Sequence, residues 1–222
     1  MSQAVFGLAS VLLGYPDAQL LALRPQLRQA VIQLPSPASR SQLKTFMSWF
    51  ATESPEQLPI NYVDTFDMKR ATSMNLTYCS CGETRRRGQA LLRLQQVLNG
   101  AGFQVCGDLP DNLLVWLEAA SMDPNCSTEL AKMRTQIEIL RRGLEKQKSP
   151  YAHVVRAVLS ELPEVDTELA DELEETGPPT EEVGVECPLL RVAPQAAGPR
   201  DPTTPLKPMR LAESTRPTGM EA

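Results

Sequence analysis

Apolar side chains recur at steps of three, four, three and four residues between positions 130 and 144. The series is Leu130, Met133, Ile137, Leu140 and Leu144. This spacing is that of an α-helix with one buried face, whereas a strand would alternate at every second residue. The opposite face is basic and carries Lys132, Arg134, Arg141, Arg142, Lys146 and Lys148. We therefore predict one amphipathic helix here, with Ser127 as its N-cap residue.

Helical periodicity covers most of the first 160 residues. The predicted helical segments are 5–13, 17–32, 43–50, 55–67, 84–98, 111–121 and 150–159, and Pro25 should kink or restart the second. Because aromatic residues make up only 5% of the chain, the core must consist mainly of Leu, Val, Ala and Met, which suit helices. The predicted fold class is all-α, a single helical-bundle domain of about seven to nine helices over residues 1–163.

The composition changes after Pro163. Residues 161–186 contain eleven acidic residues and no Lys or Arg, and nine of the nineteen prolines follow Gly177. Such a segment cannot bury enough apolar surface to order itself. We predict that residues 164–222 form a largely disordered tail, first acidic and then proline-rich. The sequence leaves open whether this tail folds back on the basic body or stays solvated.

Charge and hydropathy exclude several classes of protein. Residues 1–160 carry four more basic than acidic side chains, which is too small an excess for a nucleic-acid binder without aromatic stacking residues. No apolar run approaches the roughly eighteen residues of a membrane span, and no basic residue precedes the apolar N-terminus as in a signal peptide. Five scattered cysteines without an export signal predict free thiols and a cytoplasmic location.

No set of residues predicts catalysis or a bound metal. The single histidine, His153, lies in an apolar helical segment and reads as structural. A C-x-C pair, Cys79 and Cys81, lacks the spacing and the further ligands of a zinc site. Asp64 and Asp67 have no neighbour that would separate their pKa values. We predict a non-enzymatic protein without cofactor, and keep a thiol or metal redox protein built on the two cysteines as the alternative.

The segment from Tyr62 to Leu94 carries the most specific pattern. Its first part is Y-x-x-x-F-D, with Tyr62, Phe66 and Asp67, and its second is R-A-T-S, from Arg70 to Ser73. The third part comprises Gly82, Glu83, Arg85, Arg87, Gly88, Gln89 and Ala90. This order resembles the NarJ/NarW-type nitrate reductase molybdenum-cofactor assembly chaperones, relatives of the TorD/DmsD-type redox-enzyme chaperones.

Looser matches and a few departures accompany this pattern. The triplets "YPD" at 15–17 and "LPD" at 109–111 and the "SPYA" at 149–152 occur in the family's order. The family's histidine before Gly-Glu is Cys81 here, and its acidic residue between the two arginines is Arg86. Thr84 replaces a serine and keeps the hydroxyl. The exchanges at 81 and 86 remove an imidazole and invert a charge, so client preference can differ while the fold is retained.

The resemblance implies an all-helical chaperone that is not part of the final enzyme. It would bind the apo catalytic subunit of nitrate reductase, in part through its N-terminal segment, and keep it competent for cofactor insertion before membrane attachment. The predicted client-binding residues are Tyr62, Phe66, Asp67, Arg70, Ser73, Glu83, Arg85 and Arg87. Alternatively, Asp67, Arg70 and Glu83 only lock the joint between helices. A sister chaperone for another molybdoenzyme remains possible, and the sequence leaves the oligomeric state open.

Overall fold

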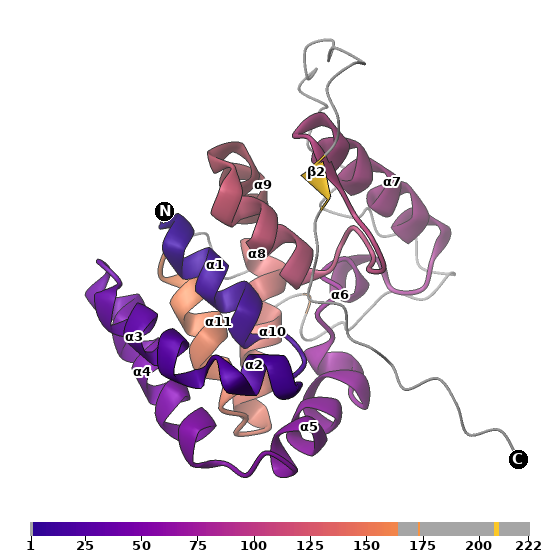
Figure 1. Ribbon diagram of the computed structural model, residues 1–222. Helices are drawn as coiled ribbons and strands as arrows, with labels where there is room; N and C mark the ends of the chain where they lie inside the picture. The colour runs from indigo at the N-terminus through magenta and orange to yellow at the C-terminus, as the bar shows by residue number, and fades with distance from the viewer. Residues whose placement is uncertain (1, 164–172, 174–206, 209–222) are drawn as a thin grey trace, which may run out of the picture.

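The computed structural model describes residues 2–163, 173 and 207–208, and this part of the chain is almost entirely helical (Figure 1). The elements are α1 (Gln3–Leu12), α2 (Ala18–Ala22), α3 (Arg24–Gln33), α4 (Pro37–Thr52), α5 (Gln57–Tyr62), η1 (Val63–Asp67), η2 (Arg70–Thr72), α6 (Tyr78–Cys81), α7 (Arg85–Gly100), β1 (Phe103–Gln104), α8 (Leu113–Met122), α9 (Pro124–Lys132), α10 (Arg134–Lys146), α11 (Tyr151–Leu159) and β2 (Lys207–Pro208). The all-α prediction is confirmed. The predicted tail over 164–222 lies outside the described residues, apart from residues 173 and 207–208.

The eleven described α-helices exceed the predicted seven to nine because several are short or interrupted. Three of them, α2, α5 and α6, have only four to six residues. The predicted single helix across 130–144 is also two helices, α9 and α10, which meet at Met133. Met133 is buried at 1% exposure and lies outside the regular helical geometry, so the apolar spacing continues across the break.

The start of α9 corrects the predicted cap. Asp123, not Ser127, is the N-cap residue, and its side chain accepts a hydrogen bond from the Asn125 amide. Ser127 lies inside the helix, buried, and its hydroxyl donates to the Ala120 carbonyl over 3.0 Å. Pro124 at the first helical position explains the earlier start, since its fixed φ favours that place.

Four helices form the main apolar core, and we call α1, α4, α8 and α11 the bundle. Helix α1 packs on α8 and α11, and α11 also packs on α4. α8 is buried almost all round, with Leu113, Val115, Trp116 and Leu117 each at 2% exposure or less. A helix apolar on every side belongs in the middle of a packed domain. None of the helices in the described ranges is long and apolar enough to cross a membrane.

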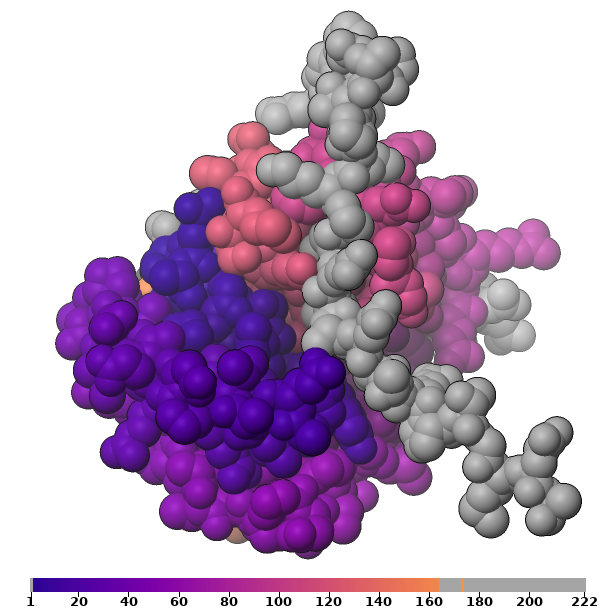
Figure 2. Space-filling view, in the orientation of Figure 1, coloured from indigo at the N-terminus to yellow at the C-terminus, as the bar shows by residue number. Residues whose placement is uncertain are grey.

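Helix α7 stands beside the bundle rather than in it. Figure 1 shows it on the far side of α6 from α1 and α4, and Figure 2 shows the N-terminal helices forming a continuous surface away from it. It contacts β1 and α6, and its buried residues are Ala90, Leu94 and Leu98. β1 pairs with β2 in parallel over two residues, which leaves the fold class unchanged. The segment between α5 and α7 therefore connects two parts of the molecule.

Candidate functional site

We call residues 62–87 the joint, since they link the bundle to α7. Its first members, Tyr62 and Phe66, are 7% exposed and belong to a cluster of rings. Their centroids are 4.9 Å apart, and Tyr151 of α11 lies 5.0 Å from Phe66 and 5.9 Å from Tyr62. Burial, and then the fields of Tyr151 and of Asp67, raise the pKa of Tyr62 well above its usual value. These rings fasten the joint to the bundle.

The residues that follow Tyr62 and include Phe66 form a π-helical turn, η1. The Met68 amide donates to the Val63 carbonyl over 3.1 Å, and the Thr72 hydroxyl donates to the Thr65 carbonyl. π-helical turns are rare and occur often at functional sites. The turn leaves Asp67 exposed and Met68 71% exposed.

The R-A-T-S segment packs against α10. A Cβ atom at Gly143 would come within 2.5 Å of the Ala71 carbonyl oxygen, so glycine is required for this approach. The Gln147 side chain donates to the Thr72 hydroxyl over 3.3 Å and accepts from the Lys69 ammonium over 3.2 Å. Thr72 is fully buried, whereas Arg70 is exposed.

Ser73 starts a short antiparallel contact with the residues that lead into α8. Its hydroxyl accepts from the Asn75 amide over 3.2 Å. The Leu76 amide donates to the Asp111 carbonyl, and the Leu113 amide donates to the Met74 carbonyl, each over 2.9 Å. Two backbone hydrogen bonds thereby fix the joint to the start of α8.

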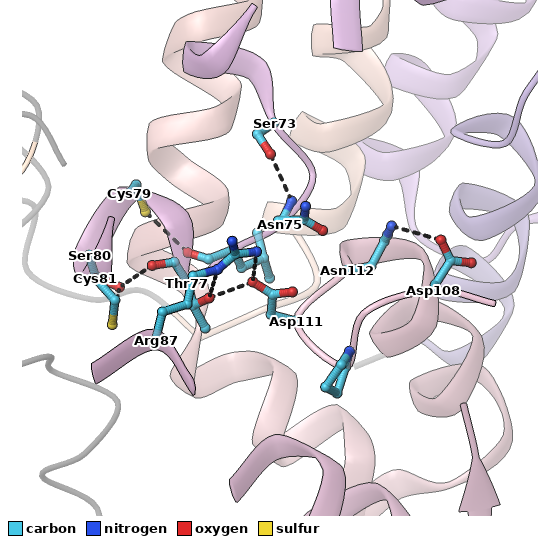
Figure 3. Close-up of polar contacts among 12 residues, drawn as sticks. Ser73, Asn75, Thr77, Cys79, Ser80, Cys81, Arg87, Asp108, Asp111 and Asn112 are labelled. Carbon is cyan, nitrogen blue, oxygen red and sulfur yellow. Dashed lines mark hydrogen bonds and ion pairs between the residues drawn. The ribbon is translucent and has the colours of Figure 1, made fainter. Parts of the chain in front are cut away.

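Thr77, Arg87 and Asp111 form what we call the polar latch (Figure 3). The Arg87 guanidinium donates to Asp111 Oδ2 over 3.3 Å and to the Thr77 hydroxyl over 3.2 Å, and that hydroxyl donates to the same carboxylate oxygen. The Asp111 side chain is 0% exposed and that of Arg87 is 18% exposed. A buried carboxylate needs such a partner, because an unpaired charge in the interior is costly. The latch ties α7 to the turn before α8.

The G-E-x-R segment forms the turn into α7. Gly82 has φ +56°, a backbone conformation that favours glycine. The Thr84 hydroxyl donates to the Cys81 carbonyl over 2.7 Å. The serine that the family has at this position carries the same hydroxyl group. Glu83 and Arg85 are exposed, and neither has a hydrogen-bond or ion-pair partner among the described residues.

The predicted client-binding residues therefore fall into two groups. Tyr62, Phe66 and Arg87 point inward and hold the joint together, and Ser73 is half-buried in the contact with the start of α8. The exposed members are Asp67, Arg70, Glu83 and Arg85.

Sequence reasoning missed four residues that hold the joint: Thr77, Asp111, Gly143 and Tyr151. Asp111 and Tyr151 lie in the looser matches "LPD" and "SPYA", which were the available signal for them. Nothing in the sequence paired Asp111 with Arg87, which is 24 residues away.

The described cysteines differ in burial and in bonding. Burial raises the pKa of Cys79 to about 12, and its thiol donates to the Leu76 carbonyl over 3.2 Å. Cys79, Cys106 and Cys126 are free, as predicted, but Cys81 is disulfide-bonded, so the prediction of free thiols is wrong there. The described part of the chain contains no cluster of three or more His, Cys, Asp or Glu side chains that could hold a metal.

His153 fits the structural role predicted for it. Its Nδ1 lies 2.8 Å from the side-chain oxygen of Gln42 on α4. Burial, and then the Arg156 guanidinium, lower its pKa below the usual 6.5.

Comparison with known proteins gives consistent results. The family model for the nitrate reductase delta subunit matches residues 32–157. The probable nitrate reductase molybdenum cofactor assembly chaperone NarJ of Bacillus subtilis is 34% identical over 163 residues, covering 72% of this chain and 89% of that protein. NarJ of Escherichia coli K12, named as the same kind of chaperone, is 30% identical over 151 residues, 65% of this chain and 64% of the relative.

Two further similarities are more limited. The nitrate reductase-like protein NarX of Mycobacterium tuberculosis is 34% identical over 157 residues, but the match spans only 24% of its length. A crystal structure of a protein assigned as a redox enzyme maturation protein from Archaeoglobus fulgidus superposes with a TM-score of 0.55. It covers 72% of this chain and 93% of that one at 20% identity, so it shows a shared fold.

Proposed function

The chain belongs to the nitrate reductase delta subunit family of molybdenum-cofactor assembly chaperones, and we propose on that premise that it binds the apo catalytic subunit of a nitrate reductase. Members of this family assist assembly and are not catalysts. The bound subunit would be kept competent for insertion of the molybdenum cofactor and would attach to the membrane only afterwards. Binding would take place in the cytoplasm and would involve the client's N-terminal segment.

The observation that carries the proposal is the division of the motif into an inner and an outer set. The inner side chains fix the joint, while Asp67, Arg70, Glu83 and Arg85 are exposed without a partner among the described residues. These four charged side chains form no hydrogen bond or ion pair within the described residues, so they are available to bind another chain. Such rim charges set orientation and association rate more than affinity.

Apolar side chains near the joint could provide the affinity. Tyr15, Ile60, Met68 and Leu109 are between 43% and 71% exposed. Tyr15 packs edge-on against Tyr62 with centroids 5.4 Å apart, and Met68 directly follows Asp67. An amphipathic client segment with apolar anchors and charged flanks would complement this surface.

Calorimetric titration of the full chain with a peptide from the N-terminus of a nitrate reductase catalytic subunit tests the proposal. We expect saturable binding that weakens by about tenfold in Met68→Ala, since a central apolar anchor contributes more than about 1 kcal/mol. The double variant R70A/R85A should weaken it by at most a few-fold, because each exposed ion pair contributes about 0–1 kcal/mol.

Matched controls come from α3, where Ile32 is 46% exposed and Arg28 is also exposed. Ile32→Ala and Arg28→Ala should leave the affinity unchanged. No binding by the unmodified chain, or equal losses in the α3 variants, would contradict the proposal. If only the N-terminal segment of another molybdoenzyme binds, the protein is the sister chaperone.

A further inference from the structure

A strongly basic surface is formed by side chains of α9, α10 and α11. Between residues 129 and 156 seven cations face three carboxylates, an excess of four positive charges in a chain whose net charge is −5. We call the cations the basic face; they are Lys132, Arg134, Arg141, Arg142, Lys146, Lys148 and Arg156. The proposed function makes no use of this surface.

Ion pairs order the basic face without neutralising it. Glu138 accepts from Arg141 over 2.8 Å and from Arg142 over 3.1 Å. Glu145 accepts from Arg156 over 2.7 Å and also from Arg141. Glu138 and Glu145 are each shared by two guanidinium groups, and the third carboxylate, Glu129, accepts from Lys132 over 2.6 Å, so seven cations still outnumber three carboxylates. A polyanion would meet side chains already held in place, which lowers the entropic cost of binding.

Two surface cavities lie along this face. One has a volume of about 340 Å³ and is lined by Arg134, Arg141 and Arg156 together with residues at the end of α11. The other, of about 390 Å³, shares Arg156 with the first and is also lined by Glu145, by His153 of α11 and by Trp49 of α4. The face is therefore hollowed as well as basic.

The chain itself leaves the bundle at the edge of this face. The Arg134 guanidinium donates to the Leu159 carbonyl over 2.5 Å and to the Leu162 carbonyl over 3.1 Å. The residues that follow are acidic: segment 164–186 contains ten Asp and Glu and no Lys or Arg. Leu173, which the structure does describe within this segment, is helical and 8% exposed, so other atoms cover it.

We propose that segment 164–186 docks on the basic face. From Arg134 to Lys146 α10 rises about 18 Å, a distance that about six extended residues span. A tether this short gives an effective concentration in roughly the millimolar range, so the acidic segment outcompetes dilute anions. The docked segment shields the basic face from nucleic acids and other polyanions.

A carbodiimide, which joins a carboxylate directly to a lysine amine, tests the contact in the full chain. Lys132, Lys146 and Lys148 are exposed on the basic face, and the equally exposed Lys44 on α4 is the internal control. We expect cross-linked peptides that join 164–186 to the first three lysines and not to Lys44. The cross-links should vanish at about 0.5 M salt, where the Debye length is only a few ångströms.

Two further samples test whether the cross-links depend on the acidic residues and whether they form within one chain. In one variant the ten acidic residues of 164–186 are changed to Asn and Gln. We expect no cross-links between the three lysines and the tail in this variant, including its carboxylates beyond residue 186. A mixture of isotopically labelled and unlabelled chains should yield cross-links only within one label. Equal reaction of Lys44, absence of the cross-links, or cross-links between differently labelled chains would each overturn the proposal.

Discussion

The bundle and the joint are held together by different forces. In the bundle, side chains such as Val5, Phe6 and Leu117 are wholly buried among other apolar groups. In the joint, the wholly buried side chains include Thr72 and Thr77, each held by hydrogen bonds. Apolar packing tolerates changes of shape that keep volume, whereas hydrogen-bonded groups fail when one partner is lost. The joint should therefore fix one geometry more strictly than the bundle does.

The largest expected loss of stability comes from breaking the polar latch. Arg87→Ala leaves the Asp111 carboxylate buried without its cation, and removing one partner of a buried pair costs about 3–5 kcal/mol. Urea unfolding followed by circular dichroism measures the loss. The double variant R87M/D111L should recover most of it, because an apolar pair of similar volume avoids the buried charge. A loss below about 1 kcal/mol would show that the latch is dispensable.

The next effect concerns the contact between the joint and α10. Gly143→Ala forces a Cβ atom against the Ala71 carbonyl and should lower the free energy of unfolding by about 1–3 kcal/mol. Gly88→Ala on α7 is the matched control, since a Cβ there meets nothing within 4 Å. That variant should raise stability by about 0.5–1 kcal/mol through helix propensity. Equal effects in both variants would refute the close approach.

A smaller effect tests the rings that join the two regions. The Tyr151 hydroxyl is buried and has no hydrogen-bond partner among the residues that the structure describes, and burial raises the pKa of Tyr151 well above its usual value. Tyr151→Phe keeps the ring contacts and removes the unpaired hydroxyl, so stability should rise by about 1 kcal/mol. Thermal unfolding of the two proteins measures the difference. A marked loss of stability would mean that the hydroxyl is hydrogen-bonded.

The smallest effect is a pH dependence within the bundle. Burial, then Arg156, lower the pKa of folded His153 below 6.5, so protons bind preferentially to the unfolded chain. Its contribution to stability is complete above that value and is lost as the pH falls towards the folded-state pKa. His153→Gln should flatten the decline in melting temperature between about pH 7 and pH 5. An unchanged slope would assign the decline to other groups.

The sequence predicted the helices better than their connections. Asp17 caps α2 and Pro25 restarts the chain as α3, because capping and proline geometry act locally. The break at Met133 was missed, since its buried side chain continues the apolar spacing across the interruption. The latch was missed for a different reason. Arg87 and Asp111 are distant in the sequence, and only the folding of the chain brings them into contact. The motif located the joint but could not separate inward from outward side chains.

The positions of the two tryptophans give the joint an optical readout. Trp116 is fully buried and donates its indole N–H to the Pro110 carbonyl, one residue before Asp111. Trp49 is half-buried, 5.6 Å from the Tyr151 ring that contacts Phe66. The fluorescence of Trp116 therefore reports on the latch, and that of Trp49 reports on the ring cluster. Opening of the joint would shift the emission of both without any attached dye, and the two signals can be told apart by replacing either residue with phenylalanine.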